Sequence, residues 1–205
     1  MSERSIIDTL SFRAGEVILY PGRVGPRDRI YRVESGLVRI QSVDNDGNAL
    51  TLRFVKEGGY FGEEALTGEK RSYHAEAAVD TRIAQVSTAN LTPEETLEIA
   101  GHLVEALSQA YDAIHRLTTQ RLRHRVARAM LELADTPLAF RDSRGRITIR
   151  ATHDEIAAAV GSVRETVTKI IGELTREGVI KSGYGRILLL DLQTLRELAD
   201  SRGPA

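Results

Sequence analysis

The sequence contains no cysteine. This absence excludes disulfides, zinc sites built on thiolates, iron–sulfur clusters and cysteine nucleophiles, and it fits a protein of the reducing cytoplasm. The sequence also lacks any run of about 18 apolar residues, which is the length that a membrane span requires. Its N-terminal segment has no long apolar stretch typical of a secretion signal. We therefore expect a cytoplasmic protein without a membrane partner.

Arrangements of catalytic or metal-binding residues are missing as well. The sequence shows no P-loop and no recognisable Ser/His/Asp arrangement. Its five histidines are too dispersed to supply a close pair of metal ligands, since they stand at positions 74, 102, 115, 124 and 153. We therefore predict neither a metal site nor an enzyme.

The 28 Lys and Arg residues nearly balance the 29 Asp and Glu residues, but the charges are unevenly distributed. Residues 1–120 hold 13 basic and 18 acidic side chains, a net charge of −5, whereas residues 121–205 hold 15 and 11, a net charge of +4. Unevenness of this size can arise by chance. It also fits a chain of two parts that have different partners.

Short segments of alternating hydrophobicity, separated by glycines, predict strands between residue 12 and about residue 88. A strong hairpin turn is expected at Asp44–Asn48, where Asn, Asp and Gly favour positive φ angles. Strands at such regular spacing predict an antiparallel sandwich or barrel. Residues 1–8 and 201–205 are expected to be frayed. The predicted strands are Glu16–Tyr20, Arg29–Val33, Leu37–Val43, Ala49–Val55, Tyr73–Val79 and Thr81–Val86.

A long helical segment runs from Pro93 to about Ala134, and its length predicts a hinge near residues 121–125. Thr92 and Glu95 form a capping box at its start. Apolar residues then recur at alternating steps of four and three, which predicts a seam with a partner helix and therefore a homodimer. The alternative is a helix that packs on its own sheet. The predicted dimer interface consists of Leu103, Leu107, Ala110, Ile114 and Leu117.

The last section predicts a winged helix-turn-helix. A strand at Arg146–Arg150 is followed by a helix that the capping box Thr152–Glu155 opens. Gly161 ends this helix, and a second capping box, Ser162–Glu165, opens a helix over residues 163–177. A β-hairpin with a Ser-Gly-Tyr-Gly tip follows, and Asp191 caps the last helix.

The helix over residues 163–177 has one apolar and one polar face. At about 3.6 residues per turn, Arg164, Glu165, Thr168 and Lys169 share an arc opposite the apolar set. Arg pairs with guanine and Glu accepts from cytosine in a major groove, so we predict that Arg164, Glu165 and Lys169 read bases of double-stranded DNA. The alternative is a solvated face, on which Glu165 is a cap and forms an i,i+4 ion pair with Lys169.

Contacts with DNA phosphates are predicted around this helix, at helix starts, at a strand end and on the hairpin. They would hold the protein in register without reading sequence. The predicted residues are Arg150, Thr152, Ser162, Thr168, Lys181 and Arg186.

The segment "THDEIAAAVGSVRETVTKIIGELTREGVIKSGYGRILLLD" (residues 152–191) resembles the DNA-binding domain of the cyclic-AMP receptor protein/FNR family. The preceding strands and long helix are similar to that family's cyclic-nucleotide-binding β-roll and dimerisation helix. The runs "GSVRETVTKIIGEL" and "YPG" also resemble stress- and stationary-phase regulators of the Thermus–Deinococcus group. The resemblance implies an α+β fold with a β-roll over residues 1–92, a dimerisation helix over 93–121 and a winged helix-turn-helix over 122–205.

A transcription regulator that binds a two-fold symmetric promoter site as a homodimer is what this resemblance implies. Lys169 stands where the cyclic-AMP receptor has an arginine, and lysine lacks the planar fork of donors, so discrimination at that base pair is expected to be relaxed. The loop Phe140–Arg146 is a candidate contact for RNA polymerase, which would make the protein an activator. An ordinary polar hairpin turn is the alternative for this loop.

The resemblance also implies a cyclic-AMP pocket, with Arg71 and Ser72 on the phosphate, Gly62 and Glu63 near the ribose, and Tyr111 on the long helix near adenine. A second carboxylate, Glu64, stands where the cyclic-AMP receptor has an apolar residue, and it would repel a phosphate. We therefore favour a vestigial pocket, in which Arg71 pairs with Glu63 or Glu64 and the regulator needs no effector. A nucleotide-sensing module whose helix-turn-helix contacts proteins is the alternative function.

Overall fold

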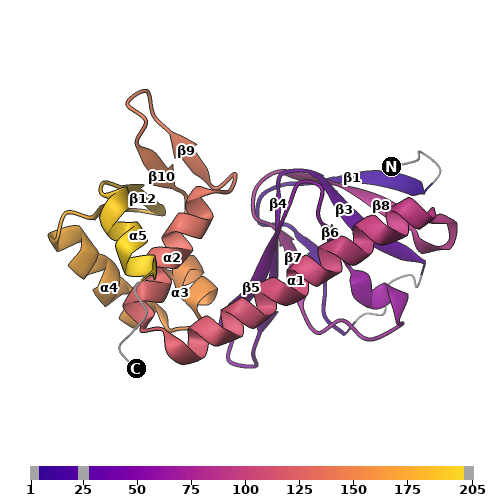
Figure 1. Cartoon of the computed structure of the whole chain (residues 1–205), viewed down its shortest axis with the longest axis horizontal. Coiled ribbons are helices and arrows are strands. Elements are labelled where there is room, and N and C mark those ends of the chain that lie inside the picture. The colour runs from indigo at the N-terminus through magenta and orange to yellow at the C-terminus, as the bar shows by residue number, and fades with distance from the viewer. Residues whose placement is uncertain (1–4, 23–27, 201–205) are drawn as a thin grey trace. The chain divides into compact units, whose positions relative to one another are not determined.

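The structure of the chain is a computed structural model, and it describes residues 5–22 and 28–200 (Figure 1). The chain forms two compact units whose boundary falls between Tyr111 and Asp112. This boundary lies inside the long helix α1 (Pro93–Thr119), so both units include a part of that helix. The predicted frayed end at residues 201–205, and residues 1–4 at the other end, lie outside the described residues.

The first unit contains two four-stranded antiparallel sheets, as the strand pattern predicts. One has the order β1 (Ile6–Phe12), β8 (Thr81–Ser87), β3 (Arg29–Ser35), β6 (Tyr60–Phe61). The other has the order β2 (Val17–Leu19), β7 (His74–Ala77), β4 (Leu37–Val43), β5 (Ala49–Lys56). Apolar side chains from both sheets form the core, which includes Val33, Val38, Ile40, Phe61, Ala75 and Ile83.

Strand β1 corrects the prediction that residues 1–8 are frayed. Ile6–Phe12 pairs antiparallel with β8, from Ile6 opposite Val86 to Phe12 opposite Thr81. None of its seven side chains is fully buried, so its hydrophobic alternation is weak. Backbone hydrogen bonds to a neighbour distant in the sequence form this strand, and local pattern does not reveal them.

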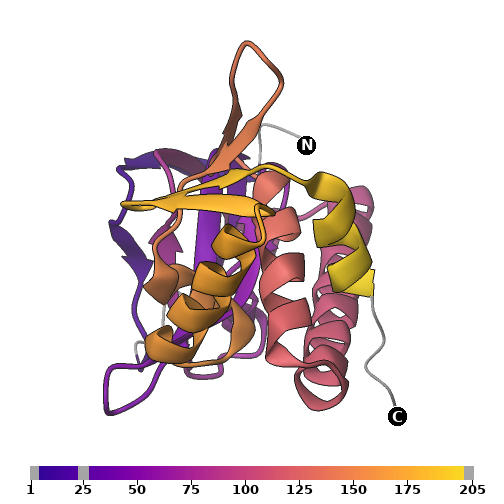
Figure 2. The same cartoon turned by 90° about the vertical axis from the view of Figure 1, so that its left-hand side faces the viewer.

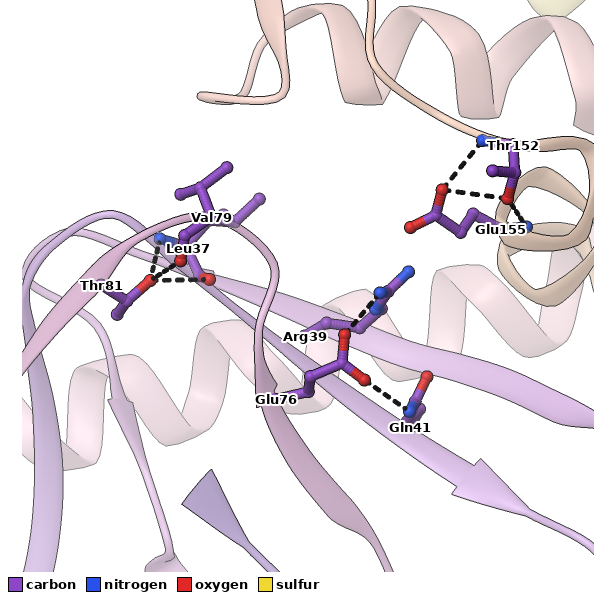
Figure 3. A network of polar contacts seen from close by, with 8 residues as sticks. All are labelled: Leu37, Arg39, Gln41, Glu76, Val79, Thr81, Thr152 and Glu155. Carbon is purple, nitrogen blue, oxygen red and sulfur yellow. Dashed lines mark hydrogen bonds and ion pairs between the residues drawn. The ribbon is translucent and has the colours of Figure 1, made fainter. Parts of the chain in front are cut away.

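The turn between β3 and β4 requires a glycine. Gly36 has a φ of 98°, and a Cβ atom there would lie 2.5 Å from the hydroxyl of Thr81. That hydroxyl accepts from the backbone N–H of Leu37 at 3.1 Å and lies 2.7 Å from the carbonyl of Val79 (Figure 3). The buried Thr81 therefore satisfies backbone groups at the point where the two sheets meet.

A second polar group stabilises the sheet of β4 and β7. Arg39 donates to Glu76 at 2.7 Å, and Gln41 donates to the other carboxylate oxygen at 3.3 Å (Figure 3). The side chains of Arg39 and Glu76 are 12% and 16% exposed. The charges face each other across neighbouring strands, where pairs of opposite sign stabilise a sheet.

Helix α1 begins with the predicted capping box, because Thr92 and Glu95 exchange hydrogen bonds between side chain and backbone. Two short 3-10 helices, η1 (Glu63–Leu66) and η2 (Thr88–Asn90), precede it. Ile99 and the partly buried Leu103 pack the first part of α1 against Ile30, Tyr60 and Val86 of the strands. None of the described helices combines the length and the apolar character that crossing a bilayer requires.

The described residues of the second unit form four further helices and one antiparallel sheet of order β11-β12-β10-β9. The predicted hinge is confirmed, since α1 ends at Thr119 and α2 (Leu122–Ala134) follows an extended Arg121. The other elements are β9 (Ala139–Arg141), β10 (Ile147–Ile149), α3 (His153–Val160), α4 (Arg164–Arg176), β11 (Ile180–Gly183), β12 (Arg186–Leu189) and α5 (Leu192–Asp200).

The caps of the second unit agree with the prediction at two helices and differ at one. Thr152 and Glu155 form the predicted capping box of α3 (Figure 3), and Asp191 accepts from the backbone N–H of Thr194 at the start of α5. The predicted capping box of α4 is wrong. The N-cap of α4 is Val163, with no side-chain hydrogen bond, because the turn after Gly161 extends one residue past Ser162.

This difference between the caps of α3 and α4 is testable by substitution. Thr152→Ala removes a side-chain acceptor from a helix start, so the free energy of unfolding of the second unit should fall by about 1 kcal/mol. Ser162→Ala is the matched control and should leave this free energy within about 0.5 kcal/mol, as an ordinary surface substitution does. Urea denaturation followed by circular dichroism measures both. An equal loss of unfolding free energy in the two variants would show that Ser162 does cap α4.

Candidate nucleic-acid interface and effector pocket

Helices α3 and α4 form a helix-turn-helix whose turn depends on one glycine (Figure 2). Gly161 has φ 60° and ψ 53°, which is the left-handed conformation that ends many helices, and its N–H donates to the carbonyl of Ala157. Four apolar side chains of α4 are buried, namely Val167, Ile170, Ile171 and Leu174. The face of α4 opposite to them is therefore turned to solvent, as the sequence predicts.

The predicted base-reading side chains share this solvent-facing arc. Arg164, Glu165 and Lys169 are all exposed. Among the described residues neither Glu165 nor Lys169 takes part in an ion pair, so the predicted i,i+4 pair is absent. The guanidinium of Arg164 lies 3.4 Å from the carboxylate of Asp154, and both side chains are more than 60% exposed. Solvent screens a pair of this kind, and it holds Arg164 only weakly.

The absence of a capping hydrogen bond at α4 changes the interpretation of Glu165. Its carboxylate would be used in the helix start if the Ser162 box existed, but α4 has no side-chain cap. Glu165 instead lies in the first turn of the helix, where a negative charge interacts favourably with the helix dipole. Its oxygens are therefore free to accept hydrogen bonds from a ligand.

The predicted phosphate contacts belong to the same unit but differ in how they are held. Lys181 and Arg186 lie exposed on the two strands of the wing, β11 and β12. Arg150 is exposed, and its guanidinium lies 3.4 Å from the carbonyl of Pro137. Thr152 is used as a helix cap, which leaves it less free for a ligand. The wing ends in a two-residue turn at Tyr184 and Gly185, between β11 and β12.

Thr168 has a partner that the sequence did not indicate. Its hydroxyl lies 3.0 Å from Nδ1 of His153, and Nε2 of the same ring lies 3.2 Å from the hydroxyl of Ser182. His153 begins α3, Thr168 is on α4 and Ser182 is on the wing, so one side chain joins three elements. Only the tertiary structure brings these residues together.

The predicted effector residues of the first unit are largely occupied by internal partners. The Nε atom of Arg71 donates to Glu64, and its Nη1 lies 3.5 Å from the carbonyl of Tyr20. The other oxygen of Glu64 accepts from the hydroxyl of Tyr73 at 2.6 Å. Burial raises the pKa of Tyr73, and Glu63 and Glu64 add to this, so its hydroxyl stays protonated as a donor. Arg71 therefore pairs with Glu64, one of its two predicted partners.

The neighbouring Glu63 pairs with an arginine that sequence reasoning missed. Arg53 of β5 donates to one oxygen of Glu63 at 2.5 Å. The other oxygen, Oε2, is buried and has no hydrogen-bond partner among the described residues. Gly62, with a φ of 84°, packs so closely on Tyr31 that a Cβ atom would lie 2.8 Å from the ring. The glycine and both carboxylates are thus fixed by residues of the first unit.

Ser72 and Tyr111 do not join this group. Ser72 is exposed, and Tyr111 is 63% exposed on α1. Within the described ranges neither side chain has a hydrogen bond to Arg71 or Glu63. Of the predicted pocket residues, the structure joins Gly62 and Arg71 through Tyr73 and Glu64, whereas Glu63 pairs with Arg53. Ser72 and Tyr111 take no part in these hydrogen bonds.

Comparison with known proteins agrees with both units. Residues 9–93 match the cyclic nucleotide-binding domain and residues 124–198 match the Crp-like helix-turn-helix domain. The chain therefore belongs to the cyclic-AMP receptor protein/FNR family. It is a transcriptional regulator with a helix-turn-helix DNA-binding domain, rather than an enzyme.

Two similar regulators and one similar crystal structure come from Thermus thermophilus. The transcriptional regulator SdrP is 61% identical over 96% of each chain. The transcriptional regulator LdrP is 43% identical over 84% of this chain and 88% of its own length. A crystal structure of a CRP/FNR-family transcriptional regulator from the same organism, also 61% identical, superposes with a TM-score of 0.91 and covers 96% of this chain and 100% of that one. These matches confirm the predicted family and fold class.

The Arg71–Glu64 pair should be important for the stability of the first unit. The side chains of Arg71 and Glu64 are 3% and 13% exposed, so Glu64→Ala would leave a buried cation without its carboxylate. We expect the free energy of unfolding to fall by about 3 kcal/mol. The exposed Glu69→Ala is the control and should change it by less than about 0.5 kcal/mol. Thermal or urea unfolding measures the difference, and similar values for the two variants would refute the role of this pair.

Proposed function

We propose that the protein is a homodimeric transcription activator that binds a two-fold symmetric promoter site through α4, without needing an effector. The observation that carries the proposal is the exposed polar arc of α4, where Arg164, Glu165 and Lys169 stand opposite a fully buried apolar face. A helix built in this way presents donors and an acceptor to base edges in a major groove. The reducing cytoplasm, where bacterial DNA lies, is the compartment that this function requires.

The apolar side chains of α1 support the homodimer. Leu107, Ile114 and Leu117 are between 41% and 59% exposed, and Ala110 is exposed as well. A partner helix would bury this seam, and two recognition helices would then enter successive major grooves about 34 Å apart. Leu103 packs partly against the first unit, so it would contribute to the seam less than the other four.

The hairpin of β9 and β10 supports a contact with RNA polymerase. It projects from the second unit (Figure 1), and Asp142 fixes its turn by accepting from the backbone of Arg144 and from both backbone and side chain of Arg146. These hydrogen bonds from Arg146 hold the pKa of Asp142 below its usual value. A rigid, charged tip suits recognition by another protein. The family resemblance supports an activator of the stress-response type.

The internal partner of Arg71 supports effector independence. A cyclic phosphate would have to displace Glu64 from the buried guanidinium and would meet that carboxylate as a like charge. One observation favours the alternative of a nucleotide-sensing module, because Oε2 of Glu63 is buried and has no partner in the part of the chain that the structure describes. A ribose hydroxyl could donate to such an oxygen.

Two substitutions test how the second unit binds DNA. Arg164→Ala should weaken binding to the selected site by about 1–3 kcal/mol and relax the preference at one base pair per half-site. Lys181→Ala, the matched control on the wing, should weaken binding to all sequences alike and lower the salt slope by about one. Fluorescence anisotropy over a salt series, on sites selected from a random pool, measures both. An unchanged base preference in Arg164→Ala would contradict base reading by this residue.

Calorimetry with cyclic AMP separates the two proposals about the first unit. We expect no heat of binding at micromolar ligand, because Glu64 already pairs with the buried guanidinium of Arg71. DNA affinity should be the same with and without cyclic AMP. Micromolar binding accompanied by a rise in DNA affinity would overturn effector independence. Micromolar binding by a protein that shows no salt-dependent binding to DNA would support the nucleotide-sensing module instead.

A further inference from the structure

His153 joins the recognition helix to the wing through both of its ring nitrogens. Nδ1 lies 3.0 Å from the hydroxyl of Thr168, and Nε2 lies 3.2 Å from the hydroxyl of Ser182. The ring is partly buried between these residues, whereas Thr168 is exposed on the solvent-facing side of α4. His153 thus lies behind Thr168, and the side chain of Thr168 is the one that faces the proposed DNA.

Thr168 differs from four of the other helical threonines in its use of the hydroxyl. Each of these four donates to the backbone carbonyl four residues earlier: Thr96, Thr118, Thr119 and Thr175. Thr194 of α5 donates instead to the side chain of Asp191. Within the described part of the chain, the hydroxyl of Thr168 bonds only to His153. The histidine therefore draws this hydroxyl away from the usual partner within the helix.

The tautomer of His153 decides what Thr168 can offer to a ligand. A neutral imidazole donates from one ring nitrogen and accepts at the other. If Nδ1 carries the proton, it donates to Thr168, and the hydroxyl proton of Thr168 remains free. If Nε2 carries the proton, Thr168 must donate to Nδ1, and only its lone pairs remain. A phosphate oxygen only accepts hydrogen bonds, so it can bind the first arrangement and not the second.

We propose that His153 is a positioning residue that orients the hydroxyl of Thr168 to donate to a DNA phosphate. In the bound state Nδ1 donates to Thr168, and Nε2 accepts from Ser182, whose hydroxyl can supply the proton for this bond. This inference rests on the proposed DNA-binding function. It adds to that function a residue that contacts no DNA itself and acts through Thr168.

Two substitutions of His153 separate its two hydrogen bonds. The amide of an asparagine lies near the position of Nδ1, whereas that of a glutamine lies near the position of Nε2. His153→Asn should keep the donor to Thr168 and retain DNA affinity within about twofold, whereas His153→Gln should weaken binding about fivefold per recognition helix. These values correspond to one hydrogen bond of about 1 kcal/mol. Anisotropy titrations of the full chain with its selected site measure both.

A double-mutant cycle shows whether the effect passes through Thr168. Thr168→Val removes the hydroxyl at nearly constant volume, and His153→Gln should cause no further loss of DNA affinity in that background. Urea unfolding of each variant reports any loss of stability separately from binding. In labelled protein, the ¹⁵N shifts of the His153 ring should show the proton on Nδ1 in the DNA complex.

The outcomes distinguish this inference from the function on which it rests. Equal affinities of the asparagine and glutamine variants would overturn the positioning role, as would a full loss on His153→Gln in the Thr168→Val background. A proton on Nε2 in the complex would overturn it as well. If the unsubstituted protein shows no salt-dependent binding to DNA, the proposed function itself fails, and the positioning role fails with it.

Discussion

The burial of one face of α4 is the constraint on which the rest of the second unit depends. Val167, Ile170, Ile171 and Leu174 are all less than 10% exposed, and burying side chains of this size stabilises a fold by about 1.5–3 kcal/mol each. These four side chains share one face, so a large rotation of the helix about its axis would expose some of them. The polar arc is therefore set by packing on the opposite side, and the left-handed turn at Gly161 brings the chain back at the angle that this packing requires.

Charge is handled differently in the two units, and the difference follows from burial. In the first unit the buried cation of Arg71 has a carboxylate beside it, and so has the half-buried Arg53. In the second unit Lys169, Lys181 and Arg186 are exposed and make no ion pair among the described residues. A buried charge without a partner destabilises a fold, but a solvated one remains available to a polyanion. Arg71 and Arg53 are thus used inside the first unit. In the second unit Arg123 and Arg146 are also paired, whereas Lys169, Lys181 and Arg186 remain available to a polyanion.

Sequence reasoning predicted the features that local chemistry determines. Periodicity gave the buried face of α4, and the Thr–Glu spacing gave the caps at Thr92 and Thr152. Sequence reasoning failed where contacts with residues distant in the chain determine the structure. The exposed strand β1 exists because β8 pairs with it, and the contacts of Arg53 and His153 span 10 to 29 residues. The predicted capping box at Ser162 was wrong for a geometric reason. Because α4 starts one residue later, with Val163 as its N-cap, the hydroxyl of Ser162 does not cap it.

Glu165 shows what the missing cap means for recognition. A carboxylate that caps a helix already accepts hydrogen bonds from the backbone, so it needs no donor from DNA. Glu165 has no capping bond, so in a major groove its oxygens would have to accept from a base or remain unpaired among phosphates. Cytosine N4 supplies a donor there, and guanine presents only acceptors at N7 and O6. An unpaired carboxylate is a strong penalty against the wrong base. In the proposed complex, Glu165 therefore contributes to specificity mainly by rejecting incorrect sites, whereas Arg164 contributes by attraction to the correct one.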